Sequence, residues 1–127
     1  MAKKVFLICP VRKMTEDEKE GLENYVKTLE NSGIVVHWPF RDTKQEDPLK
    51  GVNIIKDNIK AIRKCDEVHI WWKSESTGSK FDLGVALALN KPIVLANEVI
   101  PDDSLPKSFE HVLVALAENY KKGMSYG

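Results

Sequence analysis

Residues 67–96, EVHIWWKSESTGSKFDLGVALALNKPIVLA, decide the fold that we predict for this chain. An apolar strand is followed by a polar loop with a glycine, a helix from about Phe81 to Leu89, and a strand at Pro92–Leu95. A loop of small hydroxylated residues that leads into a helix leaves backbone N–H groups free, and a helix N-terminus attracts anions. We expect Asp82 just inside the start of this helix, at the carboxyl edge of a sheet, where open α/β folds bind ligands. The stretch therefore predicts a ligand site as well as a fold.

The rest of the chain continues the alternation of strands and helices. Apolar runs without helical period predict strands, whereas a capping box or a helical apolar period predicts helices. Such alternation implies a parallel sheet with helices on both faces. We therefore predict one doubly wound α/β domain, flavodoxin-like or Rossmann-like, over residues 1–127, with a parallel sheet of about four to five strands and a frayed tail at 123–127. The remaining elements are strands at Val5–Cys9, Ile34–Trp38 and Val68–Trp72, a helix opened by Thr15 and Glu18, a loop at Arg41–Lys50, a helix with Val52, Ile55, Ile59 and Ile62 on one face, and a closing helix after Pro106 with an apolar face of Phe109, Val112, Leu113 and Leu116.

The composition is that of an ordinary globular protein and argues against several classes of partner. Lys plus Arg and Asp plus Glu each number 19, so no overall field attracts a nucleic acid polymer or a membrane surface. No run reaches the roughly 18 apolar residues of a membrane span. Cys9 and Cys65 lie far apart, outside any metal-binding spacing, and indicate buried thiols of a cytoplasmic protein, with a disulfide as the minor alternative. The three histidines have no partner at ligand spacing, so we expect no metal site.

Three segments carry a resemblance to a known family. They are VFLICPVR at the first strand, NIKAIRKCDEV at residues 58–68, and STGSKFDLGVALALNKPIVL at residues 76–95, which is the most specific. Together they resemble the nucleoside 2-deoxyribosyltransferase family, including its branch of nucleoside 5′-monophosphate N-glycosidases. The residues that match the order of the family motif are Ser76, Gly78, Phe81, Asp82, Leu83, Gly84, Ala86, Lys91 and Pro92.

The resemblance implies cleavage of the bond between C1′ of a (deoxy)ribose and a nucleobase. In this family a carboxylate attacks C1′, the base leaves, and another base or water captures the glycosyl-enzyme ester, as in a retaining glycosidase. Carried over by position, the nucleophile is Asp82. The resemblance further implies a nucleoside or nucleotide as substrate, no metal or organic cofactor, and a homodimer or larger assembly.

The chain departs from the family pattern at two positions. The family nucleophile is usually Glu, and Asp82 is one methylene shorter, where a misplacement of about 1 Å can cost roughly a hundredfold in rate. The transferase branch carries Asp six positions earlier, where this chain has Ser76. The monophosphate branch uses serine there to hold a 5′-phosphate, and Arg12 matches an arginine of that branch that can pair with the phosphate. We therefore favour a phosphorylated substrate and water as acceptor.

Several further residues are candidates for contact with the substrate, and some of them could have a purely structural role instead. On the second helix Asp57 or Asn58 is expected to orient or protonate the base, but only one can face the site because neighbours on a helix point about 100° apart. Ser79 and Gly78 are expected to hold phosphate or sugar with backbone amides, and otherwise serve as loop and cap residues. Trp38 is the candidate for base stacking.

The structural alternatives extend to two further features. Trp71 and Trp72 are expected to fill opposite faces of the sheet, since neighbours on a strand point opposite ways. Gly84 is expected to let the helix pack closely on the sheet.

The leading hypothesis is thus an N-glycosidase or deoxyribosyltransferase. The alternative is a non-catalytic nucleotide-binding or sensing module with a degenerate site, and a weaker third reading is a scaffold protein whose loop is only structural.

Overall fold

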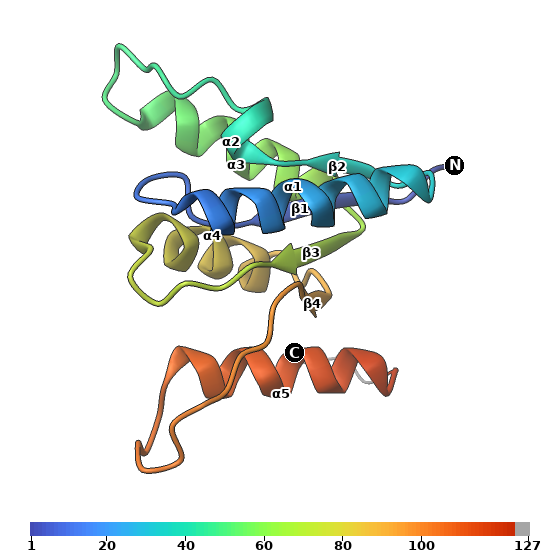
Figure 1. The fold of residues 1–127 in the computed structure, drawn as a ribbon, viewed down its shortest axis with the longest axis vertical. Coiled ribbons are helices and arrows are strands. Elements are labelled where there is room, and N and C mark those ends of the chain that lie inside the picture. The colour runs from blue at the N-terminus through green and yellow to red at the C-terminus, as the bar shows by residue number, and fades with distance from the viewer. Residues whose placement is uncertain (124–127) are drawn as a thin grey trace.

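A computed structural model describes residues 1–123, which form a four-stranded parallel sheet between layers of helices (Figure 1). The strand order is β2-β1-β3-β4, which confirms the predicted doubly wound α/β class. Residues 124–127 of the expected tail lie outside this part of the chain. The elements are β1 (Lys4–Ile8), α1 (Glu16–Asn31), β2 (Val35–His37), α2 (Pro39–Asp42), α3 (Val52–Lys64), β3 (Glu67–Ile70), α4 (Thr77–Ala88), β4 (Ile93–Leu95) and α5 (Phe109–Lys121).

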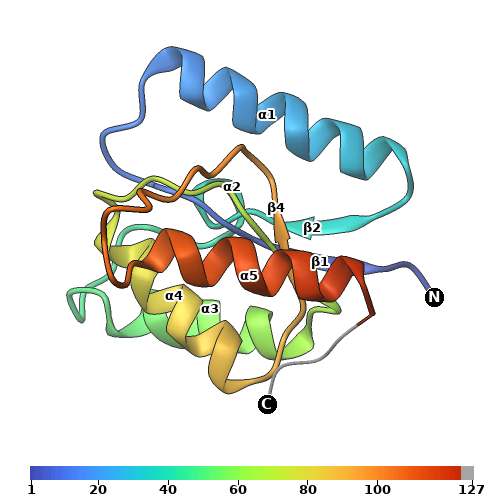
Figure 2. The same cartoon turned by 90° about the horizontal axis from the view of Figure 1, so that it is seen from below.

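The helices divide between the two faces and one edge of the sheet. Figure 2 shows α1 on one side of the strands and α3 and α4 on the other, while α5 runs along the β4 edge. None of the helices within residues 1–123 is both long and apolar enough to cross a bilayer. The central strands are buried almost throughout, as expected for a parallel sheet that is covered on both sides.

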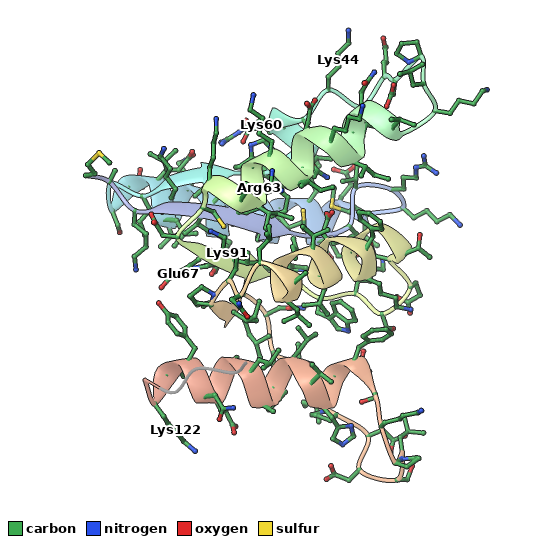
Figure 3. The ribbon with its side chains drawn as sticks, turned by 180° about the vertical axis from the view of Figure 1, so that it is seen from behind. Lys44, Lys60, Arg63, Glu67, Lys91 and Lys122 are labelled. Atoms are coloured by element: carbon green, nitrogen blue, oxygen red, sulfur yellow. The ribbon has the colours of Figure 1, made fainter. Side chains whose placement is uncertain are left out.

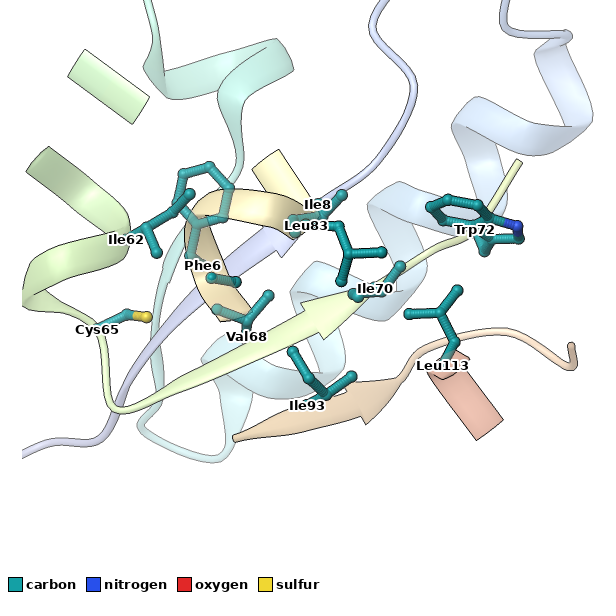
Figure 4. Packing of buried hydrophobic residues seen from close by; sticks show 11 residues of the cluster. Phe6, Ile8, Ile62, Cys65, Val68, Ile70, Trp72, Leu83, Ile93 and Leu113 are labelled. Carbon is teal, nitrogen blue, oxygen red and sulfur yellow. The ribbon is translucent and has the colours of Figure 1, made fainter. Parts of the chain in front are cut away.

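Two apolar clusters hold the layers together. The larger lies between the sheet and α3, α4 and α5, and Figure 4 shows Ile62, Leu83 and Leu113 from these helices pointing toward the strands. The smaller lies between the sheet and α1, around Leu22 and Val26. Trp72 belongs to the larger cluster and Trp71 packs against the smaller, so the predicted opposite directions of these side chains are confirmed.

The start of α1 carries the predicted capping box. The Oγ1 of Thr15 accepts a hydrogen bond from the Glu18 amide at 3.1 Å, and the Glu18 carboxylate accepts one from the Thr15 amide at 3.2 Å. Loss of such a cap typically costs about 1 kcal/mol. The sequence signal and the local structure agree because both partners lie within one turn of each other.

The prediction of a loop at Arg41–Lys50 was wrong for its first two residues, because Arg41 and Asp42 belong to α2. Pro39 suits the first turn of a helix, and the Asp42 carboxylate accepts a hydrogen bond from the Trp38 amide at 2.8 Å. The Arg41 guanidinium then donates to the carbonyl oxygen of Val36 at 3.0 Å. This contact shields part of the open edge of β2, where unpaired backbone groups would otherwise invite another strand.

The apolar faces predicted for α3 and α5 are only partly buried. Ile62 and Leu113 are buried, but Val52, Ile55, Phe109 and Val112 remain exposed. Each strand at the sheet edges spans only three residues, so a helix of 13 residues extends beyond the surface that can cover it. The periodicity therefore predicted the two helices correctly, but it overestimated how many residues of their apolar faces are buried. The expected close packing of Gly84 on the sheet is also wrong, because a Cβ there would meet nothing within 4 Å and the residue is exposed.

Gly21 of α1 leaves room for the Trp71 indole, which packs directly against it. A Cβ added to Gly21 would lie 2.9 Å from Cη2 of Trp71. We expect Gly21→Ala to lower the free energy of unfolding by about 1 kcal/mol, because an overpacking cost of roughly 1–3 kcal/mol exceeds the roughly 1 kcal/mol gained in helix propensity. Urea denaturation of the two proteins measures the difference. In a Trp71→Leu background the same substitution should instead stabilise, and stabilisation in both backgrounds would show that the indole simply moves aside.

Candidate functional site

The site begins at the N-terminus of α4, which starts earlier than predicted. The helix begins at Thr77 rather than near Phe81, because the Ser76 Oγ accepts a hydrogen bond from the Ser79 amide at 3.3 Å and caps it. Asp82 therefore lies in the second helical turn and not in the first. Its charge is too far along the helix to serve mainly as a first-turn partner of the helix dipole, whose effect fades within one turn.

Asp82 has an unusual environment for a carboxyl group. Its side chain is only partly exposed, and no hydrogen bond or ion pair joins it to another side chain within residues 1–123. Burial raises the pKa of Asp82 from 3.8 to about 7, because removal from water disfavours the charged form. A carboxyl that is buried without a partner costs stability, and such groups are concentrated at functional sites.

Cys9 and Trp38 lie in the same region, at the carboxyl ends of β1 and β2. Burial raises the pKa of the Cys9 thiol to about 12, while the nearby Trp38 indole acts to lower this pKa and the charge of Asp82 acts to raise it. Both side chains are buried, and the Trp38 ring stacks on Phe40 at 5.3 Å. Its Nε1 makes no regular hydrogen bond in the described part of the chain. The stacking of a base on Trp38 stays a prediction; in this structure the ring is buried and Phe40 stacks on it.

The hydroxyl groups before Asp82 form a small cluster. Ser79 is buried, and its Oγ lies 2.8 Å from the Oγ of Ser76, which is partly exposed. The expected role of Ser79 in holding phosphate or sugar stays a prediction; its hydroxyl is buried in this structure and contacts Ser76 Oγ. Gly78 is exposed, and a Cβ there would meet nothing within 4 Å, so the first turn of α4 is open to a ligand.

The loop after β1 is held against the loop after β3. The Lys73 ammonium donates to the Lys13 carbonyl at 3.3 Å and pairs with Glu18 at 2.9 Å. Arg12 precedes Lys13, is exposed, and takes part in no ion pair within the described range. Lys73 therefore positions the segment that carries Arg12 beside the loop that leads to Ser76.

The candidates on α3 separate as their spacing predicted. Asn58 is buried and accepts a hydrogen bond from Thr43 Oγ1 at 2.8 Å, and Thr43 Oγ1 lies 2.9 Å from the His37 ring. Asp57 is exposed and lines a groove of about 410 Å³ between α3 and the β2 edge. None of the α4 residues described above lines that groove. Asp57 and Asn58 thus have different surroundings, and neither makes a hydrogen bond or ion pair with Asp82.

Sequence reasoning missed two residues at this edge of the sheet. Asn97 follows β4, and its side chain accepts from the Trp72 amide at 2.8 Å and donates to the Trp72 carbonyl at 3.0 Å. This pair fixes the loop that leads to α4. Cys9 was assigned only as a buried thiol, although its place at the end of β1 could have indicated proximity to a site at the carboxyl edge.

Most of the chain is similar in sequence to a known protein family. The family model of nucleoside 2-deoxyribosyltransferases matches residues 5–113. The chain belongs to the nucleoside 2-deoxyribosyltransferase family. The match includes every strand, α4 and the first residues of α5, so the predicted family is confirmed over most of the chain.

Solved structures agree with the family assignment. The CMP N-glycosidase BcmB of Clostridium botulinum is 28% identical, with a TM-score of 0.56 over 73% of this chain and 70% of that one. The 2-deoxyribosyltransferase of Bacillus psychrosaccharolyticus has a TM-score of 0.62 at 20% identity, over 86% of this chain and 89% of that one. The Leishmania mexicana 2-deoxyribosyltransferase has a TM-score of 0.56 at 23% identity, over 73% and 63%. The last two support the fold alone. A comparison with curated proteins finds no match.

Among residues 1–123, no group of three or more His, Cys, Asp and Glu side chains is placed to hold a metal ion. The chemical groups at the carboxyl edge are the Asp82 carboxyl, the Ser76 hydroxyl and the open first turn of α4. Carboxylates serve as nucleophiles in covalent catalysis, and helix N-termini attract anions.

Proposed function

We propose that this protein hydrolyses the N-glycosidic bond of a nucleoside 5′-monophosphate, with Asp82 as the nucleophile. The observation that carries the proposal is the Asp82 carboxyl itself, which lies half-buried without a side-chain partner in the second turn of α4, at the position that the motif resemblance gives to the family nucleophile. A side chain that only stabilised the helix would gain from exposure or from a partner. A nucleophile must instead keep its lone pair free for the substrate.

The reaction proceeds in two displacements. The ionised Asp82 carboxylate attacks C1′, the C1′–N bond breaks, and the base leaves with the bonding electron pair and takes up a proton. Positive charge that develops on the sugar in each transition state is stabilised by the same carboxylate. Water then attacks C1′, which returns the carboxylate and releases the sugar phosphate. The pKa of about 7 means that a substantial fraction of Asp82 is ionised at neutral pH.

The 5′-phosphate is assigned to the first turn of α4. Ser76 is partly exposed, Gly78 leaves the surface open, and the amides of Thr77 and Gly78 have no intrahelical acceptor, whereas the Ser79 amide donates to Ser76 Oγ. A dianionic phosphate gains both from these donors and from the positive end of the helix dipole. Arg12 can reach it from the neighbouring loop and add a charge-assisted hydrogen bond. The similarity to a CMP N-glycosidase supports the same substrate class.

The two α3 candidates differ in what their side chains can still bind. The Asn58 side chain is engaged by Thr43 and fixes the loop between α2 and α3. Asp57 keeps an exposed carboxylate, but it lies in the groove between α3 and the β2 edge, so we assign no base contact at Asp82 to either residue.

The direct experiment is chromatographic detection of free base after incubation with ribo- and deoxyribonucleoside 5′-monophosphates and with the matching nucleosides. We expect release from at least one monophosphate and a fall in kcat/KM of at least about a hundredfold when the 5′-phosphate is absent, because several charge-assisted hydrogen bonds are lost. Equal rates on free nucleosides would contradict the phosphate assignment. Release of no base from any compound, at high enzyme concentration, would leave the nucleotide-binding module as the better reading.

Matched variants separate phosphate binding from chemistry. Ser76→Ala and Arg12→Ala should raise KM for the monophosphate and leave the rate on the free nucleoside nearly unchanged. Lys13→Ala, in the same loop as Arg12, serves as the control for a general loss of positive charge, since Lys13 contributes its backbone carbonyl to Lys73. An equal effect of the Arg12 and Lys13 substitutions would remove Arg12 from the site.

A further inference from the structure

The groove between α3 and the β2 edge lies outside the candidate site. Its volume of about 410 Å³ falls in the range of roughly 300–1,000 Å³ that is typical of small-molecule sites. Val5, Ala61 and Cys65 contribute to its lining, and none of the described residues of α4 does. The groove therefore offers apolar contact to a small molecule at a place where the proposed reaction has no group.

The end of the groove toward the C-terminus of α3 is cationic. Lys4 of β1 lines it together with Lys60 and Lys64 of α3, which lie one helical turn apart. All three residues are exposed, and none takes part in an ion pair within residues 1–123. Figure 3 shows Lys60 on the side of α3 toward β2, whereas Arg63, which does not line the groove, lies nearer to α4. An anion bound here would offset the mutual repulsion of three ammonium groups.

The opposite end of the groove carries His37, whose tautomer is set by its neighbours. Thr43 Oγ1 donates to the Asn58 side-chain oxygen at 2.8 Å and lies 2.9 Å from Nε2 of His37. Because a hydroxyl has one proton, Thr43 can only accept from His37, so Nε2 carries the proton and Nδ1 of the neutral ring keeps its lone pair. Burial lowers the pKa of His37, which favours the neutral ring. In the described part of the chain Nδ1 makes no hydrogen bond.

Two carboxylates lie at the same end as His37. The Asp42 carboxylate already accepts hydrogen bonds from the Arg41 guanidinium and the Trp38 amide. Asp57 is exposed and takes part in no ion pair within residues 1–123. The groups left for a ligand at this end are therefore acceptors, namely the Asp57 carboxylate and Nδ1 of His37, and they require a ligand that donates.

We propose that the groove binds a flat phosphate monoester that carries N–H donors at its far end. The phosphate lies among Lys4, Lys60 and Lys64, and the donors face Asp57 and His37. Asp57 and Lys64 are separated by about 10 Å along α3, which is roughly the span from the phosphate to the base amino group of adenosine 5′-monophosphate. A phosphate dianion suits three ammonium groups better than a carboxylate does, and lysine binds phosphate as a point charge. The flat part of the ligand then covers the apolar lining.

A small molecule suits the groove better than an added strand. The carbonyl oxygen of Val36, on the open edge of β2, already accepts from Arg41 at 3.0 Å, so the edge has lost an acceptor that a new strand needs. The proposal does not depend on the proposed reaction, because no residue of the groove is assigned a role at Asp82.

Residue-resolved NMR tests the proposal with adenosine 5′-monophosphate as the probe. Full-length Asp82→Asn protein is used so that the probe is not consumed. We expect saturable shifts of the His37, Ala61 and Lys64 amides with a Kd below about 1 mM, separate from any shifts at residues 77–79. Adenosine, which lacks the phosphate, and purine riboside 5′-monophosphate, which lacks the amino group, should bind the groove at least about tenfold more weakly. Shifts at residues 77–79 alone, or none at 5 mM probe, would overturn the proposal.

Matched variants of α3 separate a specific site from general attraction of anions. Lys60→Glu should weaken binding in the groove at least about tenfold, and Lys60→Gln should weaken it less. Arg63→Glu has the same change of charge within one turn but lies outside the groove, so it should bind as before. Equal losses for Lys60→Glu and Arg63→Glu would show that only the overall charge of α3 acts. Asp57→Ala should remove the preference for adenosine 5′-monophosphate over purine riboside 5′-monophosphate, and an unchanged preference would contradict the assignment of the donor end.

Discussion

Asp82→Asn protein is expected to release base at least about a thousandfold more slowly than wild type at pH 8. The amide has nearly the same shape and carries no charge, so it neither forms the glycosyl ester nor stabilises positive charge on the sugar. The residual rate reports substrate binding and positioning by the other groups. Single-turnover chromatography with enzyme in excess over the monophosphate measures the chemical step directly. A variant that keeps more than about a tenth of the wild-type rate would show that Asp82 is not the nucleophile.

The pH profile and a second variant sharpen the same prediction. Only the ionised carboxylate attacks C1′, so the wild-type rate should rise as pH passes through about 7 and then level off. The residual rate of the Asp82→Asn protein should not show this rise with pH. Asp82→Glu restores the usual family side chain. A faster variant would indicate a site that has lost part of its activity, whereas a slower one would indicate a backbone adjusted to the shorter Asp.

Local sequence signals predicted most of the fold. The capping box at Thr15 and Glu18 was predictable because both residues lie within one helical turn. The parallel sheet was predictable because apolar strand patterns alternate with helical patterns along the sequence. The start of α4 was misplaced because Ser, Thr and Gly favour loops when taken one at a time. In the folded chain Ser76 caps the helix, and the turn from Thr77 to Lys80 becomes helical. Tertiary context thus overrode local propensity at the element that carries the site.

The candidate site was predictable in position and not in environment. The family motif led to Asp82, but its burial depends on which elements pack over the second turn of α4. The proximity of Cys9 depends likewise on how β1 and α4 meet across the sheet edge. The exposed residues on the apolar faces of α3 and α5 were beyond a periodicity argument, because an apolar stripe has the same sequence pattern whether or not the rest of the chain covers it.

Asp82→Asn is also expected to change how stability depends on pH. The folded-state pKa of about 7 lies above the value of 3.8 for a carboxyl in water, so between these values the folded chain holds a proton that the unfolded chain releases. The contribution of Asp82 to the free energy of unfolding of the protein therefore falls as pH rises from about 4 to about 7, and it is constant at higher pH. Neutral Asn has no such dependence.

The difference in unfolding free energy between variant and wild type should grow by about 3 kcal/mol in favour of the variant from pH 5 to pH 8.5. Urea denaturation at the two pH values measures it, and other titrating groups cancel in the difference. Asp47→Asn is a control of opposite sign, because the Asp47 carboxylate accepts hydrogen bonds from the amides of Gly51, Asn53 and Ile54 and its loss should destabilise. A constant difference for Asp82→Asn would mean that water reaches the carboxyl freely. A growing difference would show that the group proposed to do the chemistry is retained at a cost to the fold.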